Sequence, residues 1–151
     1  MASEYRTKRK KIVDAFVDEL KTKLNGQHPF NSNVSNNVEG HTQFIDEIVQ
    51  FPSICVIAGD EARQYQPDGF KWRFLNIEIR VYVSDETDPQ EELALLLEDI
   101  ERVIDNNDVL VYDDTVDPSL KTTSSTILTI STDEGVLTPL GLGEIAIQVR
   151  Y

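Results

Sequence analysis

The sequence predicts an α+β fold: a mainly antiparallel or mixed sheet of about four to six strands, with two main helices packed on one face. Two kinds of periodicity carry this prediction. Apolar residues recur every three to four positions in residues 8–24 and 88–104, as in helices with one buried face. They recur at every second position in residues 74–83 and 144–151, as in strands. The length of 151 residues suits a single domain spanning residues 1–151.

The first helix is predicted over residues 8–24. Its apolar stripe consists of Ile12, Val13, Phe16, Val17, Leu20 and Leu24. Asn25-Gly26 then provides a left-handed stop, because glycine adopts positive φ at no steric cost. Residues 27–43 are rich in Asn and lack a periodic apolar pattern, so we expect a long loop whose role the sequence leaves open.

The next segments are predicted to form an antiparallel hairpin. Residues 52–58 form a continuous apolar run, typical of a buried central strand, and residues 44–50 are compatible with a short helix or a strand. Residues 59–72 form a polar connection with a Pro-Asp-Gly turn signal, which leads into the alternating strand at 74–83. Cys55 lies in the apolar run, which favours a buried, unreactive thiol.

The second helix is predicted to begin after Asp88, which can cap its free N–H groups. Pro89 suits the first helical position and Glu91 the capping box. Residues 109–112 are compatible with a short edge strand, and residues 113–123 with a polar connection. Residues 126–131 and 144–151 complete the predicted sheet. We expect the last of these strands to have an unpaired edge on which a partner can dock.

The sequence motifs do not predict a catalytic, cofactor or metal site. His28 and His41 fall in the Asn-rich loop, and neither a glycine-rich phosphate loop nor a His/Cys metal cluster is present in the sequence. Three carboxylates near one turn, Asp113, Asp114 and Asp117, leave a small metal-dependent hydrolase as an alternative, although they lack the ligand spacing of a calcium loop. No apolar run approaches the roughly 18 residues of a membrane helix, so we expect no membrane partner.

Charge is strongly negative and unevenly distributed. The net charge is −13, and residues 85–117 carry thirteen Asp or Glu against one Arg, whereas residues 1–24 carry seven Lys or Arg against four acidic residues. An acidic surface repels phosphate backbones. It is compatible with a solvated face that aids solubility or with a wall past which DNA slides. The two segments are also candidates for complementary patches between copies of the chain.

Two connections are predicted to contact partner proteins, because they carry Gly, Pro, charged and aromatic residues rather than core residues. Aromatic and basic residues interleave in residues 60–72, a pattern found in single-strand nucleic-acid sites and in protein interfaces. The net negative charge favours a protein interface. The second connection is the loop after residue 132. The candidate interface residues are Arg63, Tyr65, Trp72, Asp133, Glu134, Gly135, Pro139, Leu140 and Gly141.

Taken in order, these segments resemble the tail terminator (tail completion) proteins of long-tailed bacteriophages. The resemblance rests on the amphipathic first helix, on FLNIEIRVYV followed by DPQEELALLLEDIERVI, and above all on the ending STDEGVLTPLGLGEIAIQVRY. It implies a structural virion protein that forms a homohexameric ring at the head-proximal end of the tail, made in the bacterial host cytoplasm. The ring would cap the tail tube, stop its polymerisation and meet the head-completion protein, while DNA passes through the lumen. It implies no catalysis and no cofactor, and another head–tail connector, a head-closure or adaptor protein, is the alternative.

Overall fold

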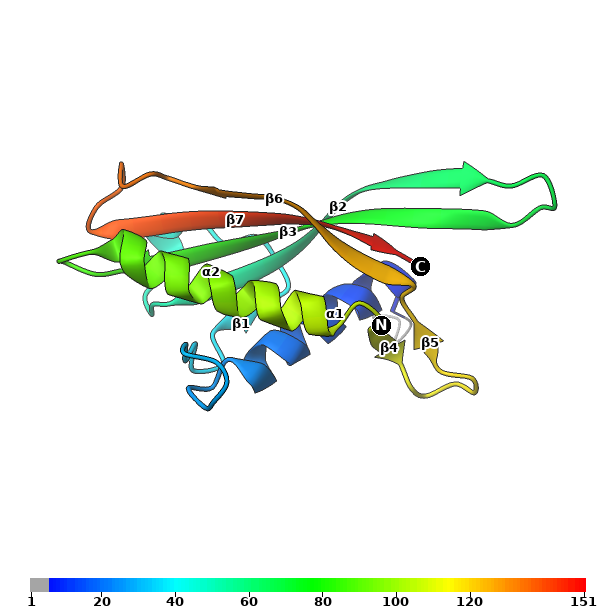
Figure 1. Cartoon of the computed structure of the whole chain (residues 1–151), viewed down its shortest axis with the longest axis horizontal. Helices are drawn as coiled ribbons and strands as arrows, with labels where there is room; N and C mark the ends of the chain where they lie inside the picture. The colour runs from blue at the N-terminus through cyan, green and yellow to red at the C-terminus, as the bar shows by residue number, and fades with distance from the viewer. Residues whose placement is uncertain (1–5) are drawn as a thin grey trace, which may run out of the picture.

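The computed structural model describes residues 6–151 and confirms the α+β class (Figure 1). Five strands form one mixed sheet in the order β1-β2-β3-β7-β6, and β4 and β5 form a separate small hairpin. The elements are, in chain order, α1 (Lys8–Lys23), β1 (Val38–Glu39), the short 3₁₀ helix η1 (Ile45–Glu47), β2 (Ser53–Tyr65), β3 (Lys71–Ser84), α2 (Pro89–Asn106), β4 (Val111–Asp113), β5 (Leu120–Lys121), β6 (Ser124–Thr132) and β7 (Leu140–Arg150).

Both helices cover the same face of the sheet, and the hydrophobic core lies between them and that face (Figure 1). Alternate residues of β3 and β7 supply the sheet side of the core, and the predicted stripes of the two helices supply the other side. Neither α1 nor α2 has the length and apolar composition that a membrane span requires. The fully buried side chains of the sheet include Leu75, Ile77, Ile79, Ile145, Ile147 and Val149.

The predicted caps are confirmed except for the Glu91 half of the capping box, because the Asp88 N–H donates to the Asp85 carboxylate at 3.1 Å instead. The Asp88 carboxylate accepts a hydrogen bond from Glu91 N at 3.1 Å, and Pro89 occupies the first turn of α2. The Thr7 hydroxyl caps α1 in the same way. Gly26 has a φ of 83°, so the Asn-Gly stop after α1 uses the left-handed conformation that glycine favours.

The last strand lies inside the sheet, and the prediction that it has an unpaired edge was wrong. Strand β7 pairs antiparallel with β3 from Phe74↔Arg150 to Ser84↔Leu140, and with β6 on its other side. Its alternating pattern reflects one face against the helices and one face away from them. The unpaired edge on this side belongs to β6 instead.

Strand β2 is much longer than the strand predicted from the apolar run at residues 52–58. It continues through the polar residues to Tyr65, and β3 already begins at Lys71, so residues 59–72 are mostly hairpin rather than loop. The predicted turn itself is present, with Gly69 at a φ of 83°. The strand is also not central, because β1 covers its other edge only at Ile54 and Cys55. A β-bulge between Ala58 and Glu61 marks where β2 leaves the core.

Three other segments refine the prediction. Residues 44–50 contain the 3₁₀ helix η1, and the expected edge strand at 109–112 is β4, which pairs with β5 rather than joining the main sheet. The Asn-rich loop is anchored to the core by buried Phe30, Val34 and Val38. The side chain of Asn37 donates to two backbone carbonyls, those of Gln50 at 2.7 Å and Pro52 at 3.1 Å.

Candidate assembly interface

The candidate interface residues fall at opposite ends of the long axis (Figure 1). One end is the distal part of the β2–β3 hairpin, residues 60–73, which we call the arm. The other end is the connection between β6 and β7, residues 133–139, which we call the tip loop. The arm holds Arg63, Tyr65 and Trp72; the tip loop and the start of β7 hold Asp133, Glu134, Gly135, Pro139, Leu140 and Gly141.

The arm carries an exposed aromatic cluster held by ring contacts. Tyr65 is 68% exposed and Phe70 is 50% exposed. The rings of Phe70 and Trp72 meet edge to face, with their centroids 4.9 Å apart. The Trp72 ring also contacts the Arg150 guanidinium, whose central carbon lies 4.2 Å from the ring centroid. Aromatic groups on a two-stranded ribbon that extends beyond the core are typical of a protein contact surface. Phe70 was not among the predicted residues, although it lies in the aromatic run that predicted the others.

A polar cluster around Glu61 fixes the base of the arm to the rest of the subunit. The Tyr151 hydroxyl donates to the Glu61 carboxylate, and Arg9 of α1 donates to the same carboxylate at 3.3 Å. Burial opposes ionisation of Glu61, but the hydrogen bonds from Tyr151 and Arg9 lower its pKa below the usual value. The pKa of Tyr151 is raised by burial and by Glu61. The arm is therefore oriented by contacts with both α1 and the residue after β7.

The tip loop is a structured loop organised by Asp133. The Asp133 carboxylate accepts hydrogen bonds from Leu137 N at 3.0 Å and Leu142 N at 3.1 Å, and from the Gln90 amide of α2 at 2.9 Å. Burial opposes ionisation of Asp133, but these hydrogen bonds leave its pKa below the usual value. Gly135, with a φ of 86°, allows the tight turn that follows. Asp133 therefore organises the loop, and its predicted contact with a partner stays a prediction.

The tip loop displays two large apolar residues. Val136 is 83% exposed and Leu137 is 38% exposed. Glu134 and Pro139 are exposed beside them. Val136 and Leu137 were not among the candidate interface residues named from the sequence, because apolar residues are usually buried in the core. An ordered loop that holds apolar side chains in solvent is a candidate docking surface.

Leu140 and Gly141 belong to β7 rather than to the displayed loop. Leu140 is half-buried, and Gly141 is buried against β3. A Cβ at Gly141 would lie 2.7 Å from Val83 Cγ2 and 3.5 Å from Pro89 Cβ. Glycine therefore leaves room for the side chain of Val83 on the neighbouring strand β3. The contact of Gly141 with a partner stays a prediction.

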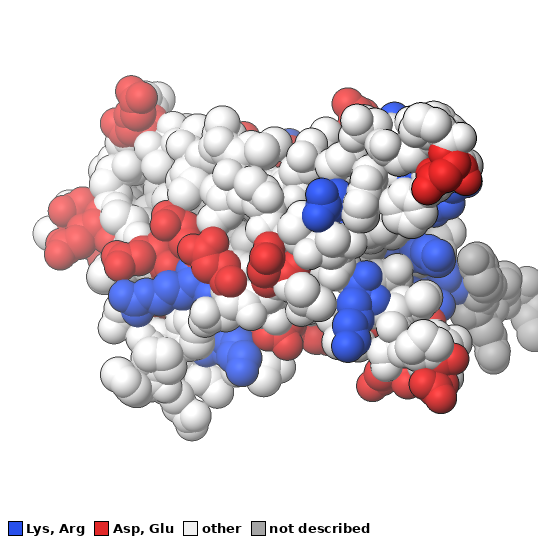
Figure 2. All heavy atoms as spheres, turned by 45° about the vertical axis from the view of Figure 1, so that its right-hand side comes forward, with Lys and Arg blue, Asp and Glu red and all other residues white. Residues whose placement is uncertain are grey.

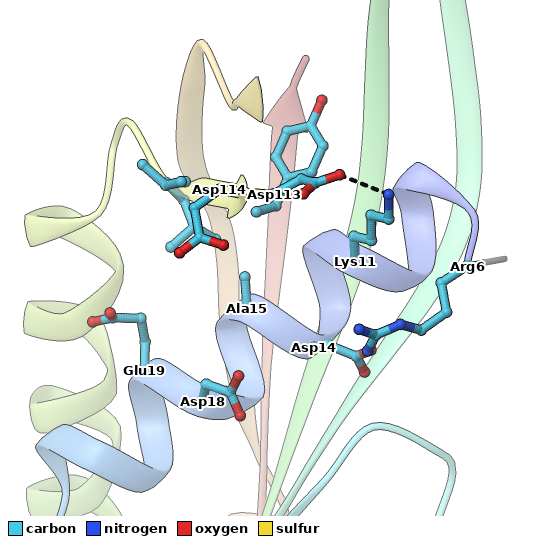
Figure 3. Close-up of a pocket in the computed structure, with 11 residues that line it drawn as sticks. Arg6, Lys11, Asp14, Ala15, Asp18, Glu19, Asp113 and Asp114 are labelled. Carbon is cyan, nitrogen blue, oxygen red and sulfur yellow. Dashed lines mark hydrogen bonds and ion pairs between the residues drawn. The ribbon is translucent and has the colours of Figure 1, made fainter. Parts of the chain in front are cut away.

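A cleft of about 320 Å³ between α1 and β4 collects several carboxylates (Figure 3). The Lys11 ammonium donates to Asp113 at 2.7 Å across this cleft, and Asp14 pairs with both Arg6 and Lys10 at 2.9 Å. In Figure 3 the side chains of Asp18 and Glu19 point in different directions. Within residues 6–151, no group of three or more His, Cys, Asp or Glu residues is arranged to hold a metal ion. Asp113 thus forms an ion pair between β4 and α1, whereas Asp14 pairs within α1 and with Arg6 just before it.

Opposite charges lie next to one another within the subunit. The basic segment around α1 packs beside the acidic segment around α2 and β4, where Lys11 pairs with Asp113 and Asn107 donates to Glu19. One ion pair between the two segments thus forms within the subunit, and their contact across copies stays a prediction. Figure 2 shows acidic side chains in a band along α2 and at the tip-loop end, and more basic side chains towards the arm. The arm, residues 60–73, holds three Lys or Arg against three Asp or Glu, so it is far less acidic than the segment around α2.

The sequence matches a family model described as Bacteriophage Tail Tube Terminator Protein over residues 6–151. The chain belongs to this family. It is 40% identical to the tail tube terminator protein p142 of Escherichia phage T5 over 151 residues, which is 95% of this chain and 92% of the relative. Tail tube terminators are structural components of the virion tail rather than enzymes.

A solved structure shares the fold of this tail tube terminator at much lower identity. A chain in the virion of a native gene transfer agent particle superposes with a TM-score of 0.58 and 10% identity, covering 92% of this chain and 96% of that one. The likeness supports the fold alone. The family match extends over the whole of residues 6–151, and so over both the arm and the tip loop.

Proposed function

We propose that this protein assembles into a ring, a homohexamer, that caps the finished tail tube and stops its polymerisation. The observation that carries the proposal is the family match, which extends over residues 6–151 and so includes both the arm and the tip loop. The ring also presents the tail side of the interface with the head-completion protein. A subunit with distinct surfaces at its two ends suits a position between two different structures.

The tip loop is our candidate for the contact with the tail tube or with the head-completion protein. The fixed conformation of the loop supports this role. Asp133 and Gly135 hold the loop in one conformation before it binds, so binding does not carry the entropic cost of ordering a flexible loop. Val136 supplies an apolar contact at its apex, 83% exposed. Deleting the loop with the start of β7 would remove core contacts of Gly141, so point substitutions are the sharper test.

The test uses a phage that lacks this protein, complemented with variants. Loss of the protein should produce overlong tails, seen by negative staining, and the wild-type chain should restore normal length. Val136→Asp should fold as the wild type and leave tails overlong or unjoined, whereas Val49→Asp, a change at a residue 97% exposed outside the tip loop, should restore them. Empty, leaky heads on tails of normal length would instead indicate a head-closure or adaptor protein. Normal particles with Val136→Asp would remove the tip loop from the interface.

DNA passes through the lumen of the proposed ring without sequence-specific binding. The net charge of −13 supports this, because acidic surfaces repel the phosphate backbone and do not hold it. The purified ring should therefore bind neither double- nor single-stranded DNA at moderate salt. Tight, salt-sensitive binding in a gel-shift assay would contradict this part of the proposal.

A further inference from the structure

Strand β6 forms an open edge of the main sheet. It pairs with β7 on one side, and in the part of the chain that the structure describes no strand pairs with its other side. The start of this edge is capped, because the Asp108 carboxylate accepts a hydrogen bond from Ser125 N at 3.0 Å. Beyond that cap, residues 126–132 have no comparable cover from another strand, and their outer backbone groups are available for pairing.

The composition of this edge is unusual for an exposed strand. Natural edge strands are protected by charged residues, Pro, β-bulges or short length, because an open edge is a template for another strand. Of these devices β6 has only an irregularity in its pairing with β7 between Ile127 and Thr129. Residues 124–132, SSTILTIST, hold no charged residue and no Pro, in a chain of which 27% is charged. Leu128 is 51% exposed and Ile130 is 39% exposed. Nine uncharged residues at an open edge, five of them β-branched Thr or Ile, are compatible with a surface used for strand addition.

The arm provides a second open edge on the opposite side of the same sheet. Strand β1 pairs with β2 only at Ile54 and Cys55, so the later part of β2, residues 60–65, has no second strand beside it among residues 6–151. This part extends past the core and is oriented by the contacts of Glu61. One chain therefore has two different open edges, which is the condition for a heterologous, ring-forming contact.

The two edges have complementary surroundings. Helix α2 runs alongside β6, since Gln90 near its start contacts Asp133 after β6, and Asp108 just past its end contacts Ser125 at the start of β6. Exposed Asp105 and Asp108 thus lie near the start of the open edge. The arm is balanced in charge, with Arg63, Lys71 and Arg73 against three acidic residues, and its basic side chains are the ones that can pair with Asp105 and Asp108. Exposed Tyr65 and Phe70 can meet the exposed Leu128 and Ile130. Opposite charges that meet across such a contact steer it and fix its register.

We propose that residues 126–132 of β6 in one copy pair with residues 60–65 of the arm in a second copy. The contact adds a strand of one subunit to the sheet of the next, and its repetition around an axis closes the ring. The inference rests on the proposed ring, but it specifies which surfaces form it. It places the arm between subunits and leaves the tip loop free for other partners.

Cysteine cross-linking in assembled tails tests the contact directly. In a Cys55→Ala background, Thr129→Cys on β6 is combined in turn with Ala62→Cys, Arg63→Cys or Gln64→Cys on the arm, so that different registers are sampled. At least one pair should give a reducible ladder of linked chains on a non-reducing gel, because paired strands bring Cα atoms within disulfide range. The control pair Val49→Cys with Arg63→Cys should stay monomeric. Tails of normal length in which no edge pair forms a ladder would overturn the inference and leave the capping function intact.

Edge-blocking variants decide the question if the cysteine variants fail to assemble. Leu128→Lys places a charge on the open edge at an exposed position, and Val49→Lys is the matched control. Both should keep the far-UV circular dichroism of the wild type, but Leu128→Lys should be lost from purified tails while Val49→Lys is retained. Retention of Leu128→Lys in normal tails, or formation of rings that fail only to bind tubes, would contradict pairing between copies. If loss of the wild-type protein leaves tail length unchanged, the proposed function itself fails.

Discussion

Lys11 and Asp113, 102 residues apart in the sequence, are joined by a 2.7 Å hydrogen bond between ammonium and carboxylate. Asp113 also accepts from the backbone N–H of Thr115 at 3.0 Å and from its hydroxyl at 2.6 Å. These contacts attach the β4–β5 hairpin to α1, and the hydrogen bond from Lys11 contributes most to lowering the pKa of Asp113 from 3.8 to about 2. The pair thus links an element outside the main sheet to the core.

This pair predicts a defined acid sensitivity. Because the folded pKa of about 2 lies below the ordinary value of 3.8, the ionised carboxylate stabilises the fold above that ordinary value, and this stability is lost as the pH falls towards about 2. Asp113→Asn should lower stability at neutral pH and flatten the fall in the urea midpoint over this window. Asp114→Asn, which changes the exposed neighbour, should keep the wild-type pH profile. An Asp113→Asn profile parallel to the wild type would exclude this role for the pair.

Asp133 should stabilise the tip loop more than its neighbour does. Replacing it with Ala leaves two backbone N–H groups and the Gln90 amide without their acceptor, and hydrogen bonds to a charged group contribute about 1.5–3 kcal/mol. We expect Asp133→Ala to reduce the free energy of unfolding in urea by about that amount. Glu134→Gln, at an exposed position of the same loop, should change it little. Equal effects of the two substitutions would show that the loop does not depend on Asp133.

A side chain at Gly141 should destabilise the protein unless the neighbouring Val83 is made smaller. The added methyl of Gly141→Ala would lie 2.7 Å from Val83 Cγ2, and overpacking of this kind typically destabilises by about 1–3 kcal/mol. Adding Val83→Ala removes the closest contact, so the double variant should lose less than the sum of the two single variants in urea unfolding. Additive losses would mean that the strain at Gly141 has another source.

The thiol of Cys55 should be inert in the folded protein. Cys55 is completely buried, and burial raises the pKa of its thiol, so little thiolate forms and reagents cannot reach it. A thiol reagent such as DTNB should react slowly under native conditions and quickly in urea. Fast native reaction, with the circular dichroism spectrum unchanged, would indicate that β2 opens locally on the β1 side.

Residues with a clear period or a local signal could be predicted from the sequence, and residues placed by long-range pairing could not. The stripes of α1 and α2, the Asp88 cap and the left-handed Gly26 all follow from local chemistry, and all are present. The position of β7 between β3 and β6 has no local signal, because an alternating strand looks the same at an edge and in the interior. The sequence also missed the length of β2, since residues 59–65 are polar and form a strand only because β3 pairs with them.

The candidate interface could be predicted only in part for the same reason. Aromatic and basic residues in a polar segment indicated Arg63, Tyr65 and Trp72, which lie on the arm, and their contact with a partner stays a prediction. Gly141 shares a Gly-rich segment with the tip loop, but its role depends on Val83, which lies far from it in the sequence. The open edge of β6 also escaped prediction, because an uncharged alternating segment is ordinary for a strand that is paired on both sides.

The interior position of β7 has a consequence for synthesis. In the nascent chain β3 and β6 are synthesised before the strand that separates them, so each lacks a neighbour and leaves polar backbone groups unpaired until β7 is available. Residues 140–150 then complete the sheet. A chain that stops before residue 140 would leave the facing edges of β3 and β6 open and would be prone to aggregate.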